Sequence, residues 1–126
     1  MEFATWSPRM LSVLRAMTGL LFLEHGTQKF FAFPSAGPDL TPLLIVQGLL
    51  ELVGGILMVI GLFTRPVAFI LAGDMAVAYF MRHAPRGFFP QVNGGQLAIL
   101  FCFVFLYLFV AGGGAWSVDQ YRARSR

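Results

Sequence analysis

The sequence predicts an all-α integral membrane protein, an up-down four-helix bundle that forms a single domain over residues 1–126. Composition is the first reason: 57% of the residues are hydrophobic, only 12% are charged and the mean hydropathy is +0.72, which is unusual for a soluble domain. The second reason is that the apolar residues form continuous runs rather than an alternating pattern, which favours membrane helices over a barrel. A soluble helical protein is the alternative that this composition disfavours.

Four apolar stretches are each long enough to cross a hydrocarbon core about 30 Å thick. They cover residues 10–31, 41–63, 66–83 and 94–111. No small-residue cleavage site follows the first stretch, so we expect a retained span rather than a signal peptide. The connections between the stretches are short, and consecutive spans should therefore be antiparallel.

The distribution of positive charge predicts a multi-pass protein of the bacterial cytoplasmic (inner) membrane with both termini in the cytoplasm. Positive residues are retained on the cytoplasmic side, and an even number of spans places both termini there. That side would carry Arg9, Arg15, Arg65, Arg122, Arg124 and Arg126, against Lys29, Arg82 and Arg86 on the other. The basic pI reflects this asymmetry and does not indicate nucleic acid. We expect the basic C-terminal run to contact anionic lipid.

Polar residues inside the spans are the strongest indication of a site, because an ionised side chain at mid-bilayer costs about 2.5–3.5 kcal/mol. Helical spacing gathers these residues on inward faces, in the outer half of the bundle. From the four spans in order, we expect convergence of Glu24, His25, Gln28, Lys29, Gln47, Glu51, Tyr79, Arg82, His83, Asn93 and Gln96.

Within this set, Glu24, His25 and Glu51 are the candidate catalytic residues, and the others are candidate ligand-binding residues. Asp74 lies nearer the cytoplasmic side and is expected to be a structural polar residue. The alternative is that all of these groups only join helices by hydrogen bonds, each contributing about 0.6–2 kcal/mol. The number of titratable groups favours a site, since Ser, Thr or Asn could join helices without burying charge.

Metal and haem sites are disfavoured by spacing. Glu24 and His25 are adjacent and point about 100° apart, and no Glu-x-x-His pair of the di-iron kind occurs. His25 and His83 should differ in depth by roughly 10 Å, which argues against a shared haem iron. Cys102 is the single cysteine, so a disulfide within one chain is excluded.

Four segments carry a family resemblance. They read RAMTGLLFLEHGTQKF from Arg15, ELVGGILMVIGLFTRP from Glu51, AGDMAVAYFMRHAPRGFFP from Ala72 and NGGQLAILFCFVFLYLFVAGGGAWSVD from Asn93. Together they resemble the DoxX family of small bacterial membrane proteins over nearly the whole chain. The resemblance implies the single-domain four-helix membrane fold and a setting of quinone-linked oxidoreduction or oxidative stress. It transfers no catalytic residue.

We therefore expect a redox-associated subunit with an outward-facing polar pocket that binds a quinone or a similar small molecule. His25, Lys29 and Arg82 could donate hydrogen bonds, and Glu24 or Glu51 could relay protons. The ring could pack against aromatic side chains, for which the candidates are Phe30, Phe80, Phe88 and Phe89.

No flavin or iron–sulfur motif occurs, so we expect no intrinsic cofactor, and electrons would come from a redox partner protein. The remaining partners that we expect are the lipid bilayer and, as an open alternative, further copies of the chain. Two non-enzymatic functions also stay open: a scaffold or assembly protein, and a pathway for an ion or small molecule.

Overall fold

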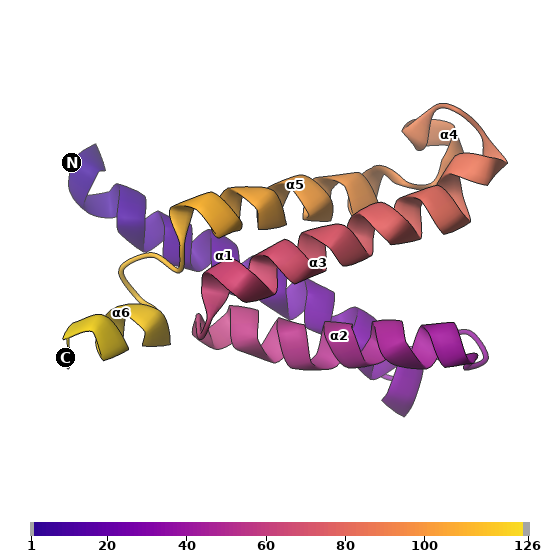
Figure 1. Ribbon diagram of the computed structural model, residues 1–126, viewed down its shortest axis with the longest axis horizontal. Helices are drawn as coiled ribbons and strands as arrows, with labels where there is room; N and C mark the ends of the chain where they lie inside the picture. The colour runs from indigo at the N-terminus through magenta and orange to yellow at the C-terminus, as the bar shows by residue number, and fades with distance from the viewer. Residues whose placement is uncertain (1, 125–126) are drawn as a thin grey trace.

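The computed structural model describes residues 2–124 and shows an all-α chain, with no strand in that range (Figure 1). This confirms the predicted fold class at the level of secondary structure. Arg126, one of the charges expected at the cytoplasmic side, lies outside the described residues. The long helices are α1 (Phe3–Phe31), α2 (Pro42–Ile60), α3 (Thr64–Ala78) and α5 (Gln96–Ala111). The short ones are the π-helix η1 (Tyr79–His83), the 3-10 helix η2 (Ala84–Arg86), α4 (Pro90–Asn93) and α6 (Val118–Arg124).

The long helices run in alternating directions and form two closely packed pairs. α1 packs along α2, and α3 packs along α5, whereas α2 and α3 meet over a shorter length. Figure 1 shows that α2 and α3 are close at their connection and diverge away from it. The N-terminus, the α2–α3 connection and α6 lie at one end of the molecule, and α4 lies at the other.

Two helical stretches of the described chain are long and apolar enough to cross a membrane. They are Pro42–Ile60 and Thr64–Arg86, and α5 is strongly apolar but shorter. The second stretch continues from α3 through η1 and η2 and is longer than the predicted span 66–83. α1 likewise begins at Phe3, several residues before the predicted start, and α6 is a helix that the hydropathy pattern does not predict.

Local signals set the bounds of α2. The Thr41 side chain accepts a hydrogen bond from the backbone N–H of Leu44 at 3.3 Å, and Pro42 occupies the first helical position, where no N–H is needed. Gly61 adopts a left-handed conformation with φ of 73° and ends the helix, as glycine does most readily.

The centre of the molecule is aromatic and joins α1 to α5. The Phe22 ring lies edge-on to Phe101 and Phe105, with centroids 5.5 and 5.1 Å away. Phe101 and Phe105 stack on each other. Met58 and Leu71 are fully buried beside them and bring α2 and α3 into the same core.

Two glycines allow α1 and α2 to approach closely. A Cβ atom on Gly26 would lie 2.8 Å from the backbone nitrogen of Leu52, and one on Gly55 would lie 2.9 Å from the Cα of Leu23. Both distances are shorter than real contacts, so larger residues would force the helices apart. Small residues at such positions are typical of membrane helix interfaces.

Arg15 is buried and binds backbone carbonyls, although the sequence predicts it to be one of the positive charges at the cytoplasmic side. Its side chain is 3% exposed. It donates hydrogen bonds to Met58 at 2.8 Å, Val59 at 3.2 Å and Trp116 at 3.1 Å, and also to Gly113. These bonds hold the end of α2 and the segment after α5 against α1.

Asp119 completes this attachment of the C-terminal segment. Its carboxylate accepts hydrogen bonds from the backbone N–H groups of Phe63 and Thr64, at 2.7 and 2.8 Å. Because these groups lie at the start of α3, Asp119 acts as a cap supplied from a distant part of the chain. α6 is thereby fixed at the α2–α3 connection.

The α1–α2 contact makes a testable prediction about glycine. Gly26→Ala should lower the free energy of unfolding by about 1–3 kcal/mol, since the added methyl group overpacks the helix interface. Gly73→Ala is the matched control, because a Cβ atom there meets nothing within 4 Å. Unfolding of the purified protein in detergent, followed by circular dichroism, would compare the two. Equal stability of both variants would contradict the role assigned to Gly26.

Candidate functional site

A polar cavity of about 240 Å³ lies between α1, α2, α5 and the stretch formed by α3 and η1. It is slightly smaller than the 300 Å³ or more that drug-sized ligands usually occupy, so it suits a small ring or head group. Its polar wall contains six of the residues that the sequence predicts to converge: His25, Lys29, Gln47, Glu51, Arg82 and His83.

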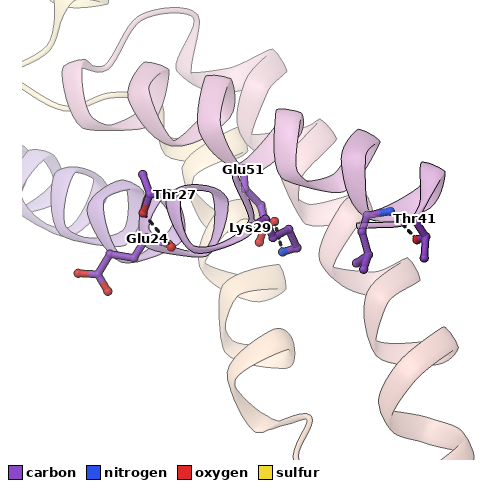
Figure 2. A network of polar contacts seen from close by, with 6 residues as sticks. Glu24, Thr27, Lys29, Thr41 and Glu51 are labelled. Carbon is purple, nitrogen blue, oxygen red and sulfur yellow. Dashed lines mark hydrogen bonds and ion pairs between the residues drawn. The ribbon is translucent and has the colours of Figure 1, made fainter. Parts of the chain in front are cut away.

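A buried ion pair between Lys29 and Glu51 joins α1 to α2 at this cavity (Figure 2). The Lys29 side chain is 10% exposed and that of Glu51 is 3% exposed. A Cβ atom on Gly48 would lie 2.7 Å from the Phe30 ring and 3.3 Å from Cδ of Lys29, so glycine leaves room for both side chains against α2. Removing both charges from water is expensive, and the pair offsets that cost only if both partners remain.

Two further charged side chains lie close to this pair. Arg82 lines the same cavity as Lys29 and Glu51, and Asp74 lines an adjacent space together with Arg82. When all four groups are ionised, two positive and two negative charges balance. The cavity can therefore be strongly polar without a large net charge, which reduces the cost of placing it among apolar helices.

Asp74 lines a second, smaller cavity of about 60 Å³ between α2 and α3. Gln47 and Arg82 line both cavities, so the two spaces share a polar wall. The Oδ2 atom of Asp74 is buried, and no described residue forms a hydrogen bond with it. This space is large enough for a water molecule. That Asp74 is only structural remains a prediction.

Both histidines line the polar cavity, although their positions along the predicted spans suggest different depths in the membrane. His25 lies edge-on to Phe101, with the ring centroids 6.0 Å apart. His83 Nδ1 lies 3.2 Å from the backbone oxygen of Asn93. Because a carbonyl oxygen only accepts, Nδ1 carries the hydrogen of this bond, and in the neutral ring Nε2 has the lone pair.

A π-helical turn carries Arg82 and His83. η1 interrupts the regular α-helical pattern just before the chain turns, and such π segments occur often at functional sites. Asn93 stabilises this turn: its side chain donates to the Tyr79 hydroxyl at 3.1 Å and to Gly87 at 2.9 Å, and it accepts from Gly95 at 2.8 Å. Asn93 and Tyr79 therefore hold the loop that positions His83.

The other predicted residues do not line the cavity. Glu24 is exposed, and Figure 2 shows its carboxylate directed away from Lys29 and Glu51. Gln28 donates to the Ser35 hydroxyl at 3.0 Å and so attaches the α1–α2 loop to α1. Gln96 is exposed at the start of α5. The residues outside the cavity are thus Glu24, Gln28, Tyr79, Asn93 and Gln96.

The aromatic wall of the cavity consists of Phe22 and Phe101, which sequence reasoning did not select. The aromatic candidates Phe80, Phe88 and Phe89 are instead 69%, 87% and 66% exposed. Phe22 lies three residues before His25 on α1, and helical spacing could have identified it. Nothing in the apolar run around Phe101 distinguishes it from its neighbours.

The acidic and histidine side chains of the site are not arranged as metal ligands. Among residues 2–124 no three His, Cys, Asp or Glu side chains are grouped closely enough to hold a metal ion. Cys102 is a free thiol on α5, partly buried beside the core.

Comparison with known proteins identifies a family and relatives that are similar to most of this chain. The DoxX family model matches residues 10–84. An uncharacterized protein of Haemophilus influenzae is 45% identical over 91% of this chain and 92% of its own length. An uncharacterized membrane protein of Mycobacterium tuberculosis is 26% identical over 90% of this chain and 81% of its own length. No solved structure is significantly similar.

The ion pair makes a prediction about stability. Lys29→Met should lower the free energy of unfolding by about 3–5 kcal/mol, because the Glu51 carboxylate would stay buried without its countercharge. Adding Glu51→Met to that variant should recover most of the loss. Chemical unfolding in detergent of the wild type, both single variants and the double variant would give the coupling energy. Independent, additive effects would contradict a direct pair.

Proposed function

The chain belongs to the DoxX family of membrane proteins, and from this premise we propose that it is a redox-associated subunit whose polar cavity binds a quinone or a similar small molecule. The buried Lys29–Glu51 pair beside Arg82 and His83 carries the proposal. Uncharged polar side chains can join helices, whereas ionisable side chains inside a membrane usually mark a functional site.

We also propose that α1, α2, α5 and the stretch from α3 to η2 each span the bacterial cytoplasmic membrane. The outward faces of all four are apolar, and examples more than half exposed are Met17, Val53, Phe69 and Phe103. Such a surface is suited to lipid rather than to water. The 16 residues of α5 are short for a full crossing, and the loop carrying α4 would lie at the membrane interface.

The orientation that we propose has both termini in the cytoplasm. The end of the molecule with the N-terminus, the α2–α3 connection and α6 carries the exposed arginines 65, 122 and 124 and the half-buried Arg9. Positive charge at one end favours its retention in the cytoplasm. Arg15 adds little to this argument because its charge is enclosed by backbone carbonyls.

Reporter fusions test this orientation. Green fluorescent protein fused to the C-terminus should fluoresce, and alkaline phosphatase fused there should be inactive, because the phosphatase requires export. Phosphatase inserted in the α1–α2 loop at Gly37 should be active. The reverse pattern at both positions would show that the orientation is inverted.

The cavity offers a suitable arrangement for a ring with two carbonyl oxygens. Lys29 and Arg82 provide charged N–H donors, and Phe22 and Phe101 provide apolar surfaces against which a ring can pack. His25 and His83 each have a titratable nitrogen at the same wall. These features support binding of a small polar ring better than binding of a long hydrophilic substrate.

Protons and electrons would come from different sources. Reduction of a quinone to a quinol takes up two protons and two electrons. Glu51, Asp74 and His83 could hold and deliver protons at the cavity. The electrons would come from a redox partner protein, since no flavin or iron–sulfur motif occurs in this sequence. The protein would thus act as one subunit of a membrane redox system.

A binding measurement tests the proposal through two arginines near the same end of the molecule. Arg82→Gln should weaken binding of a decyl benzoquinone by about 10- to 100-fold, because a lost hydrogen bond from a charged donor costs about 1.5–3 kcal/mol. Arg86→Gln is the matched control, since both arginines are exposed but only Arg82 lines the cavity. Equilibrium dialysis in mild detergent would give both dissociation constants.

Two results would count against this proposal in different ways. Equal affinity of the wild type and Arg82→Gln would remove Arg82 from the binding site. Failure of the wild type to bind any benzoquinone would reject the quinone. The non-enzymatic functions, a scaffold for other membrane proteins or an ion pathway, would then be favoured.

A further inference from the structure

An apolar groove of about 380 Å³ lies between α2 and α3, where the two helices diverge from their connection. Its walls are almost entirely hydrocarbon. The side chains that form most of them are Leu49, Val53 and Leu57 on α2 and Val67, Ile70 and Leu71 on α3. Because α2 and α3 contact each other over only a short length, they leave an almost entirely apolar space between them.

The groove adjoins the small cavity at Asp74, which in turn adjoins the polar cavity. Val46 and Leu50 line both the groove and the small cavity. Gln47 and Arg82 line both the small cavity and the polar cavity. Three neighbouring spaces thus share lining residues, and their walls change from charged at the polar cavity to almost entirely apolar at the groove.

The open side of the groove faces the surface that we assign to lipid. Val53 is 56% exposed and Ile70 is 54% exposed. Between Val46 and Leu57 the groove extends about 16 Å along α2 by helix rise. That length can hold only the first part of a long hydrocarbon chain, so the rest would continue into the bilayer.

We propose that this groove holds the apolar tail of an amphiphilic ligand whose head occupies the polar cavity, and that the ligand enters from the bilayer between α2 and α3. The inference rests on the proposed function, because it requires a head group in the cavity. The order of the three neighbouring spaces, from charged to apolar, is what favours a tailed ligand. A water-soluble ligand would use the polar cavity without a hydrocarbon groove joined to it.

Because a tail leaves lipid to enter the groove, its gain in affinity comes from packing rather than from the hydrophobic effect. The gain should therefore be moderate and sensitive to shape. A bulky side chain in the groove should displace the tail without changing the charged wall of the polar cavity. Tail dependence of binding is then the property to measure.

The test compares two benzoquinones with the same head group, one with a decyl tail and one with a methyl group in its place. Binding of each to the wild-type protein and to Val53→Trp would be measured by equilibrium dialysis in mild detergent. Val110→Trp is the matched control, because Val110 is 73% exposed on α5 and does not line the groove. Both variants place the same large side chain on an outward-facing surface.

We expect the wild type and Val110→Trp to bind the decyl compound about 10-fold more tightly than the methyl compound, a difference that packing alone can supply. Val53→Trp should lose this preference and keep its affinity for the methyl compound. Native mass spectrometry of the same samples should show less co-purified long-chain ligand in Val53→Trp.

The outcomes separate the two proposals. If both compounds bind equally to the wild type, the groove holds no tail, while the proposed function stands. If Val53→Trp loses a co-purified phospholipid but keeps its preference for the decyl compound, the groove holds a structural lipid and this inference is wrong. If neither compound binds to the wild type, the proposed function fails and the inference fails with it.

Discussion

The close contact between α1 and α2 is the constraint on which the site depends. Gly26 and Gly55 bring the two backbones together, and at that separation Lys29 reaches Glu51. The ion pair in turn penalises any separation of the helices, since either charge alone would be buried without a partner. Packing and electrostatics are therefore coupled. The glycines permit the short distance between α1 and α2, and the ion pair favours that distance over a larger one.

The second helix pair is also closely packed, but it diverges from the first. α3 follows α5 closely and separates from α2 (Figure 1), so one side of the site is firmly packed and the other lies near an apolar groove. The π-turn at the end of α3 places Arg82 and His83 at the cavity, and Asn93 fixes the loop that follows. A cavity with one open side is what a ligand from the bilayer requires.

The opposite end of the molecule is held together by hydrogen bonds to the backbone. Arg15 binds carbonyl groups near the end of α2 and in the segment after α5, and Asp119 caps α3. The charged side chains in this region form hydrogen bonds with backbone groups at the helix ends, which would otherwise lack partners. These hydrogen bonds fix this end of the molecule, and the candidate site lies toward the other end.

Much of this architecture follows from the sequence by itself. Continuous apolar runs determine helices, and polar residues repeated at helical spacing identify His25, Lys29, Gln47 and Glu51 as one-sided features of α1 and α2. The tertiary structure decided which polar groups meet: Glu24 points outward, Asn93 is used within its own loop, and Phe22 and Phe101 form the apolar wall. Periodicity gives the face of a helix, but the rotation and divergence of packed helices depend on contacts between distant residues, which a local pattern does not contain.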